Sequence, residues 1–144
     1  MTISRLTTDK TTYQSANDAF YRAFAEADAD AMEALWAENT PVFCCHPGWP
    51  PILTRGEIVA SWTEIFSHGA IPDMTFVPRQ MALVGGLGIV CGIEMVGKAH
   101  FACTNVFASE AGGWRMVHHH AGPLAPGTFA QIVSPVDPGR DARH

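Results

Sequence analysis

The sequence predicts an α+β fold in which helices cover the concave face of a curved, mostly antiparallel sheet. Apolar residues recur at helical spacing in the first half of the 144-residue chain. From Asp73 onward the period changes to that of strands, and glycine-rich turns separate four such runs. Helices and strands do not alternate along this chain as a parallel sheet would require, so an antiparallel sheet is favoured. A curved sheet that helices close on one side forms a cone, and its interior is a natural ligand cavity.

Three apolar stripes predict three helices. They consist of Tyr13, Ala16, Phe20, Phe24 and Ala27, of Met32, Leu35 and Trp36, and of Ile58, Trp62, Ile65 and Phe66. Asp28 or Asp30 can cap the second helix, and Pro41 prevents its continuation. Gly69 and Pro72 end the third.

One short strand and four longer strands are predicted. The short strand covers residues 41–46 and leads into the turn-rich segment HPGWPP at 46–51. The longer strands are expected at Met74–Val84, Leu87–Val96, Ala99–Ser109 and Trp114–Ala121. Gly85-Gly86, Gly97-Lys98 and residues 110–113 form the turns between them.

The length predicts one domain. We expect an N-terminal extension at 1–12, the α+β domain at 13–123 and a Pro/Gly-rich C-terminal tail at 124–144. The apolar run 81–93 is too short to cross a bilayer. The N-terminus lacks the apolar region of a secretory signal, which favours a cytoplasmic protein.

The charge of the chain excludes two classes of partner, and its cysteine content indicates the state of its thiols. The chain has 9 Lys plus Arg against 14 Asp plus Glu and no basic run, so nucleic acid and anionic membranes are not expected as partners. Only 16% of residues are charged, which indicates that surface is hidden in a pocket or a subunit interface. The 4 cysteines lack metal-ligand spacing and predict reduced, packed thiols.

Strand alternation predicts which side chains share a face. A tight turn centred on Gly97 and Lys98 places Glu94 opposite Phe101 and Val90 opposite Asn105. A four-residue loop at 110–113 then places Asn105 opposite His118.

The same loop places Cys103 opposite His120, so that His118 and His120 share the face of Glu94. His119 is expected on the opposite face, as a subunit-interface residue. A one-residue bulge would reverse the assignment of all three histidines.

Four stretches of the chain carry a family resemblance: DAFYRAFAEADADAMEALWAENTPVFCCHPGW, ASWTEIF, ACTNVF and GWRMVHHHAGP. Over roughly residues 13–123 they resemble the SnoaL-like branch of the nuclear transport factor 2-like superfamily. The resemblance implies a cone-shaped α+β barrel with an apolar pocket and a homodimer through the outer sheet face. The superfamily includes isomerases, cyclases, dehydratases and non-catalytic binders, so the fold implies no single function.

Ketosteroid isomerase is a catalytic relative with three residues that can be compared by position. Its general-base aspartate precedes a proline after the first strand, and His46 before Pro47 holds that place here. Its oxyanion-hole acid matches Asn105, and its oxyanion-hole tyrosine matches Phe20. All three positions differ in residue type, which argues against steroid isomerisation by that mechanism.

The predicted catalytic residues are His46, Asn105 and His118. His46 can act as a base near neutral pH, or it can hold the turn by bonding a backbone carbonyl. Asn105 can stabilise an oxyanion, or it can form a cross-strand hydrogen bond with His118.

The predicted ligand-binding residues are Phe20, Trp49, Trp62, Glu94, Phe107 and His120. Trp49 is expected to cover the pocket. Glu94 is either buried and paired with a histidine, which would raise its pKa, or exposed to water at the cavity mouth.

The leading functional hypothesis is a cofactor-independent isomerase, cyclase or dehydratase that acts on a small apolar carbonyl compound, with His46 as proton carrier. The alternative is a non-catalytic ligand-binding or interaction module. A metal-dependent protein that uses His118 and His120 together with Glu94 or His46 is less favoured, and no metal or cofactor is assigned.

Overall fold

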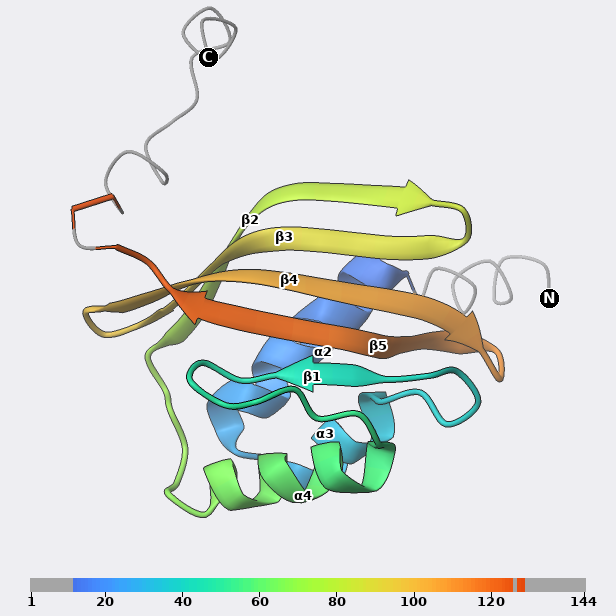
Figure 1. Cartoon of the computed structure of the whole chain (residues 1–144), viewed down its shortest axis with the longest axis horizontal. Coiled ribbons are helices and arrows are strands. Elements are labelled where there is room, and N and C mark those ends of the chain that lie inside the picture. The colour runs from blue at the N-terminus through green and yellow to red at the C-terminus, as the bar shows by residue number, and fades with distance from the viewer. Residues whose placement is uncertain (1–11, 126, 129–144) are drawn as a thin grey trace, which may run out of the picture.

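The computed structural model describes residues 12–125, 127 and 128, and it confirms the α+β order of elements (Figure 1). The helices are α2 (Tyr13–Glu26), α3 (Ala29–Leu35) and α4 (Arg55–Phe66). The strands are β1 (Phe43–Cys45), β2 (Met74–Val84), β3 (Leu87–Val96), β4 (Ala99–Glu110) and β5 (Gly113–Pro123). Most of the predicted extension at 1–12 and tail at 124–144 lies outside the described residues.

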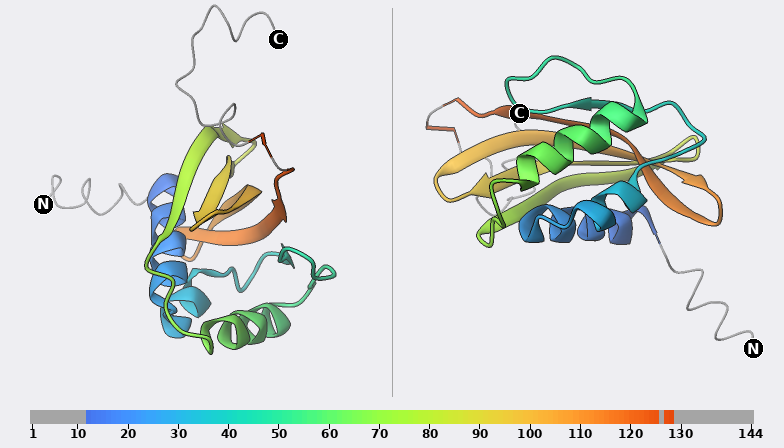
Figure 2. Two further views of the ribbon diagram at one scale, coloured as in Figure 1. Left: turned by 90° about the vertical axis from the view of Figure 1, so that its left-hand side faces the viewer. Right: turned by 90° about the horizontal axis from the view of Figure 1, so that it is seen from below.

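The five strands form one open, mixed sheet in the order β1-β5-β4-β3-β2. β1 runs parallel to β5, and all other neighbours are antiparallel. The sheet does not close into a barrel, because β1 and β2 form its two edges. α2 crosses one face in contact with β2 to β5, and α3 and α4 lie on the same side (Figure 2).

Side-chain caps set the starts of the helices. Thr12 and Ser15 form a reciprocal capping box at the start of α2, and each hydroxyl accepts from the other's backbone N–H. Ala27 follows the last residue of α2 as its C-cap, and its left-handed conformation (φ 55°) turns the chain toward α3. Asp28, one of the two predicted caps, accepts from the Ala31 N–H at 3.0 Å. None of the described helices is both long and apolar enough to cross a bilayer.

The register of β3 against β4 is as predicted, with Glu94 opposite Phe101 and Val90 opposite Asn105. The register of β4 against β5 differs from the prediction because of a bulge. Val106 pairs with His118, but the next residue of β4, Phe107, pairs with Met116.

The bulge leaves Val117 as an extra residue in β5 and reverses the faces of all residues after it. Asn105 therefore lies opposite His119, and Cys103 lies opposite Ala121. The predictions that Asn105 faces His118 and that Cys103 faces His120 were wrong.

Aromatic rings fill the interior between helices and sheet. Phe20 and Trp62 are at most 1% exposed and pack edge to face with ring centroids 5.5 Å apart. Phe24 packs against Trp62 at 4.9 Å, and Phe107 is completely buried. These aromatic contacts form the apolar part of the interior that the helices and the sheet enclose.

Gly92 allows β2 to approach β3 closely. A Cβ atom at this position would overlap both the Phe76 ring and the carbonyl oxygen of Val77. We expect Gly92→Ala to lower the free energy of unfolding by about 1–3 kcal/mol, because the backbone of β2 would have to move. Urea denaturation measures the loss.

Gly56→Ala is the matched control, since nothing lies within 4 Å of a Cβ atom at that position in α4. It should be neutral or stabilising, by up to about 1 kcal/mol, because alanine favours helix. Equal destabilisation at the two glycines would contradict the close approach as the cause.

Candidate functional site

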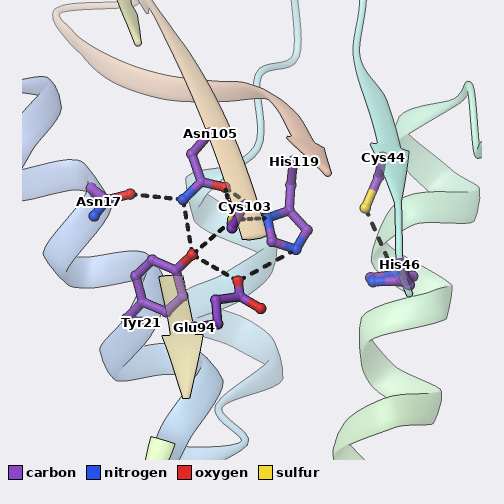
Figure 3. A network of polar contacts seen from close by, with 8 residues as sticks. All are labelled: Asn17, Tyr21, Cys44, His46, Glu94, Cys103, Asn105 and His119. Carbon is purple, nitrogen blue, oxygen red and sulfur yellow. Dashed lines mark hydrogen bonds and ion pairs between the residues drawn. The ribbon is translucent and has the colours of Figure 1, made fainter. Parts of the chain in front are cut away.

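A buried polar network connects α2 to the inner face of the sheet (Figure 3). Each of its side chains is at most 7% exposed. Its members are Asn17 and Tyr21 of α2, Glu94 of β3, Cys103 and Asn105 of β4, and His119 of β5.

Helical and strand periodicities bring these side chains together. Asn17 and Tyr21 are four residues apart and therefore share one face of α2. Cys103 and Asn105 alternate with outward-facing neighbours on β4. His119 joins them only because the β5 bulge turns it inward.

The amide of Asn105 lies at the centre of the network. Its Nδ2 donates to Asn17 Oδ1 at 2.9 Å and to the Tyr21 hydroxyl oxygen at 3.0 Å. Its Oδ1 lies 2.7 Å from His119 Nδ1. An amide oxygen can only accept, so His119 carries its proton on Nδ1 and its Nε2 is left as the free nitrogen.

Glu94 and His119 face each other as a potential acid and base. Glu94 Oε2 lies 3.8 Å from His119 Nε2. The Tyr21 hydroxyl donates to the same carboxyl oxygen at 2.7 Å and lies 3.2 Å from Cys103 Sγ.

Burial determines the protonation of this pair. It raises the pKa of Glu94, and the hydrogen bond from Tyr21 offsets part of that rise. Burial also lowers the pKa of His119 well below its usual range. Both effects favour the uncharged forms, in which Glu94 can donate a proton and His119 can accept one.

His46 lies beside the network rather than in it. Ser61 Oγ donates to the Ile58 carbonyl oxygen at 2.6 Å and lies 2.9 Å from His46 Nε2. Because the hydroxyl's single proton goes to Ile58, His46 donates Nε2–H to Ser61. The predicted alternative, in which His46 holds the turn through a backbone carbonyl, is replaced by this contact with Ser61.

Burial lowers the pKa of His46 to about 4, so the imidazole is neutral at pH 7. Cys44 Sγ lies 3.7 Å from His46 Nε2. Burial also raises the pKa of the Cys44 thiol to about 12, which excludes a thiolate nucleophile activated by His46. Trp62 packs against both His46 and His119, whose ring centroids are 6.2 Å apart.

The structure brings some predicted site residues together and separates others. Glu94 and Asn105 meet in the polar network, and Phe20 packs on His119 with ring centroids 4.9 Å apart. Trp49 packs on His46 at 5.0 Å. Phe107 lies in the apolar core.

The predicted faces of the three consecutive histidines were wrong. His118 and His120 lie on the outer face of the sheet, where they line a hollow of about 680 Å³ with Cys91 and Thr104. His119, expected at a subunit interface, is 1% exposed and lies in the interior.

Sequence reasoning missed Asn17, Tyr21, Cys103 and Ser61 as site residues. Comparison with ketosteroid isomerase aligned a tyrosine with Phe20, whereas the tyrosine that reaches the network is Tyr21, one residue later. The spacing of Asn17 and Tyr21 was the available signal, because two polar groups four residues apart lie beside the apolar stripe.

Two surface hollows reach the site residues. One of about 400 Å³ between α2 and β2 is lined by Asn17, Tyr21 and Phe76. The other, of about 350 Å³, lies beside α4 and is lined by Trp49 and Ser61. The first is thus lined by two members of the polar network, and the second by the serine that contacts His46.

A family model identifies the type of domain, and one curated protein is similar in sequence. A family model described as a SnoaL-like domain matches residues 14–126. The F-box protein SKIP8 of Arabidopsis thaliana is 26% identical over 113 residues, which cover 74% of this chain and 47% of that protein. The chain thus spans about half the length of this curated relative.

Solved structures give the same result. A provisionally named dehydratase of the NTF2-like family from Streptomyces avermitilis has a TM-score of 0.69 and 28% identity, over 82% of this chain and 97% of that chain. A provisionally named calcium/calmodulin-dependent protein kinase type II association domain from Thiobacillus denitrificans has a TM-score of 0.68 and 33% identity, over 79% and 96%. A ketosteroid isomerase-like protein from Erwinia carotovora atroseptica has a TM-score of 0.62, covers 78% and 94%, and at 19% identity shows the fold alone.

The low pKa of His46 predicts a pH-dependent loss of stability. The folded protein holds this imidazole neutral down to a pKa of about 4, whereas the unfolded chain binds the proton below about pH 6.5. Stability contributed by His46 is therefore present above pH 6.5 and is lost as the pH falls toward 4. Between pH 7 and 5 the loss is about 2 kcal/mol.

Urea denaturation at both pH values tests this contribution. His46→Gln should show a pH dependence smaller by about that amount, because glutamine does not titrate. His68→Gln, at an exposed position after α4, should keep the full dependence. Identical pH profiles for the wild type and His46→Gln would contradict the assignment.

Proposed function

This chain belongs to the SnoaL-like branch of the nuclear transport factor 2-like superfamily, and from that premise we propose that it catalyses proton transfer on a small apolar carbonyl compound. The reaction would be an isomerisation, cyclisation or dehydration that needs no cofactor. Four free cysteines fit the cytoplasmic setting that the proposal assumes.

One observation carries the proposal: Glu94 and His119 are a buried acid and base 3.8 Å apart. His119 Nε2 can take a proton from the carbon next to the substrate carbonyl, while the Glu94 carboxyl donates one to the developing oxyanion. Two protons then move in opposite directions, so the net charge of the interior stays constant. This matters because an uncompensated charge would be costly at such buried positions.

The same pair fits a dehydration. His119 takes the proton from carbon, Glu94 protonates the departing hydroxyl group, and a carbon–carbon double bond and water are formed. In an isomerisation His119 instead returns a proton to a different carbon. The similarity to a provisionally named dehydratase supports the dehydration.

Tyr21 and Asn105 are placed to position the reacting groups. Tyr21 binds the carboxyl of Glu94, and Asn105 fixes the tautomer of His119. His46 is a second proton carrier in the proposal, and burial lowers its pKa to about 4, so it too begins as a neutral imidazole that can accept a proton. The indole N–H of Trp62 is buried without a partner among the described residues, so a ligand oxygen could accept from it. The indole ring packs against both His46 and His119.

A second candidate function is an assembly module that binds without chemistry. The 33% identity to a provisionally named kinase association domain favours it, as does the aromatic packing of the interior. In both candidates we propose a homodimer through the outer sheet face, where His118, His120 and Thr104 lie.

Deuterium incorporation tests the proton-transfer proposal without knowledge of the natural substrate. The protein is incubated in D₂O with a panel of β,γ-unsaturated ketones and β-hydroxy carbonyl compounds, and exchange at carbon is followed by NMR. Glu94→Gln and His119→Gln should each lower kcat by about 10²–10⁴-fold, because each removes one proton-transfer group.

Glu26→Gln and His68→Gln are matched exposed controls and should retain the wild-type rate. Exchange no faster than the uncatalysed rate across the whole panel would favour the assembly module. Full activity of Glu94→Gln would refute the assigned role of the pair.

Light scattering tests the dimer. The expected mass is twice the 15.6 kDa of one chain. Thr104→Arg should shift the mass toward that of one chain, because it introduces a charge into the outer face. Glu26→Arg, on a helix away from this face, should not. A mass near 15.6 kDa for the unmodified protein would contradict the dimer.

A further inference from the structure

We propose that Glu94, Cys103 and His119 form a binding site for one divalent transition-metal ion of the zinc class. The three residues lie on the adjacent strands β3, β4 and β5. One donor atom from each lies within 4.8 Å of the donor atoms of the other two. All three side chains are buried, at 3%, 4% and 1% exposure.

The spacing of the donor atoms is compatible with a tetrahedral site. Glu94 Oε2 lies 3.8 Å from His119 Nε2, and Cys103 Sγ completes a group whose ligand atoms all lie within 4.8 Å of one another. Zinc bonds of roughly 2.0–2.3 Å place neighbouring ligand atoms roughly 3.3–3.7 Å apart. The Glu94 and His119 donors are already close to this spacing, and the three donors would move together by at most about 1.5 Å on binding.

The residues around the cluster already orient its donors. Asn105 accepts from His119 Nδ1–H at 2.7 Å, which directs the lone pair of Nε2 toward Glu94. A hydrogen bond on the far ring nitrogen is the usual outer-shell partner of a histidine ligand. The Tyr21 hydroxyl donates to Glu94 Oε2 at 2.7 Å and can remain as a donor to a bound carboxylate.

The charge balance favours a dication. One ion of charge +2, the thiolate of Cys103 and the carboxylate of Glu94 have a total charge of zero. The buried site thus accepts the metal with no net charge added to the interior.

The donor types select the metal. One sulfur, one imidazole nitrogen and one carboxylate oxygen suit zinc and related transition metals, whereas calcium and magnesium prefer oxygen alone. The site differs from the metal site considered from the sequence, because His118 and His120 lie on the opposite face of the sheet from Glu94.

The inference uses residues of the proposed catalytic pair but does not depend on their activity. A bound ion would occupy the lone pairs of Glu94 and His119, so metal binding and proton transfer would exclude each other. The test is a binding measurement, so an inactive protein would leave the metal proposal intact. Absence of metal binding would likewise leave proton transfer intact.

The test uses cobalt(II) and zinc(II) on tag-free protein that has been stripped with a chelator. We expect one equivalent of cobalt to bind and to produce a sulfur-to-cobalt charge-transfer band. Calorimetry in buffers of different ionisation heat should show at least one proton released per ion, from the Cys103 thiol. Excess zinc should remove the band.

Two sets of variants identify the ligands. Cys103→Ser should abolish the band, and Glu94→Gln should weaken binding at least about tenfold. Cys91→Ser, at a half-buried thiol beside Thr104, should retain both band and affinity.

The triple variant C44S/C45S/C91S leaves Cys103 as the single cysteine and should also keep the band, which tests the site even where Cys103→Ser fails to fold. Failure to bind one equivalent of metal would overturn the proposal. A band that survives Cys103→Ser, or that is lost in the triple variant, would overturn it as well.

Discussion

The buried amide of Asn105 is the constraint on which the rest of the site depends. Its two amide protons and its carbonyl oxygen all have partners, and those partners come from α2 and β5. A fully buried amide that loses a partner costs about 1–3 kcal/mol, so the helix and both strands are held in one relative position. The same hydrogen bonds set the tautomer of His119 and the direction of the Tyr21 hydroxyl. The chemistry of the pair Glu94 and His119 thus follows from a structural requirement of the interior.

The proposed proton transfer and the proposed metal binding both suit an interior whose titratable groups are uncharged. The polar network holds a carboxyl, a thiol, a phenol and two amides around one imidazole, and burial favours the uncharged form of each titratable group. Chemistry in such a place must move charge in compensating steps. A proton pair moving in opposite directions meets that condition, and so does one divalent ion bound by a thiolate and a carboxylate.

Much of the fold could be predicted from the sequence because periodicity is a local property. The bounds of β2 and β3 follow directly from alternation between two glycine turns, and the register of β3 against β4 follows from the turn at Gly97. The β5 bulge could not be predicted in the same way. Met116 and Val117 are both apolar, so either can face the interior, and three consecutive histidines carry no alternation signal. Asn17 and Tyr21 were missed since their role depends on β4, which is remote in sequence.

Because His118, His119 and His120 are consecutive, the site can tolerate the gain or loss of one residue in β5, a change that usually disrupts a strand. In most strands, gain or loss of one residue exchanges the inward and outward side chains, and an interior polar group meets a partner of the wrong kind. Here the residue opposite Asn105 would be a histidine for a shift by one position in either direction. Single-residue insertions or deletions near the bulge would therefore preserve an imidazole opposite the central amide. Related chains could differ in bulge and strand length while retaining the same chemical group at this point.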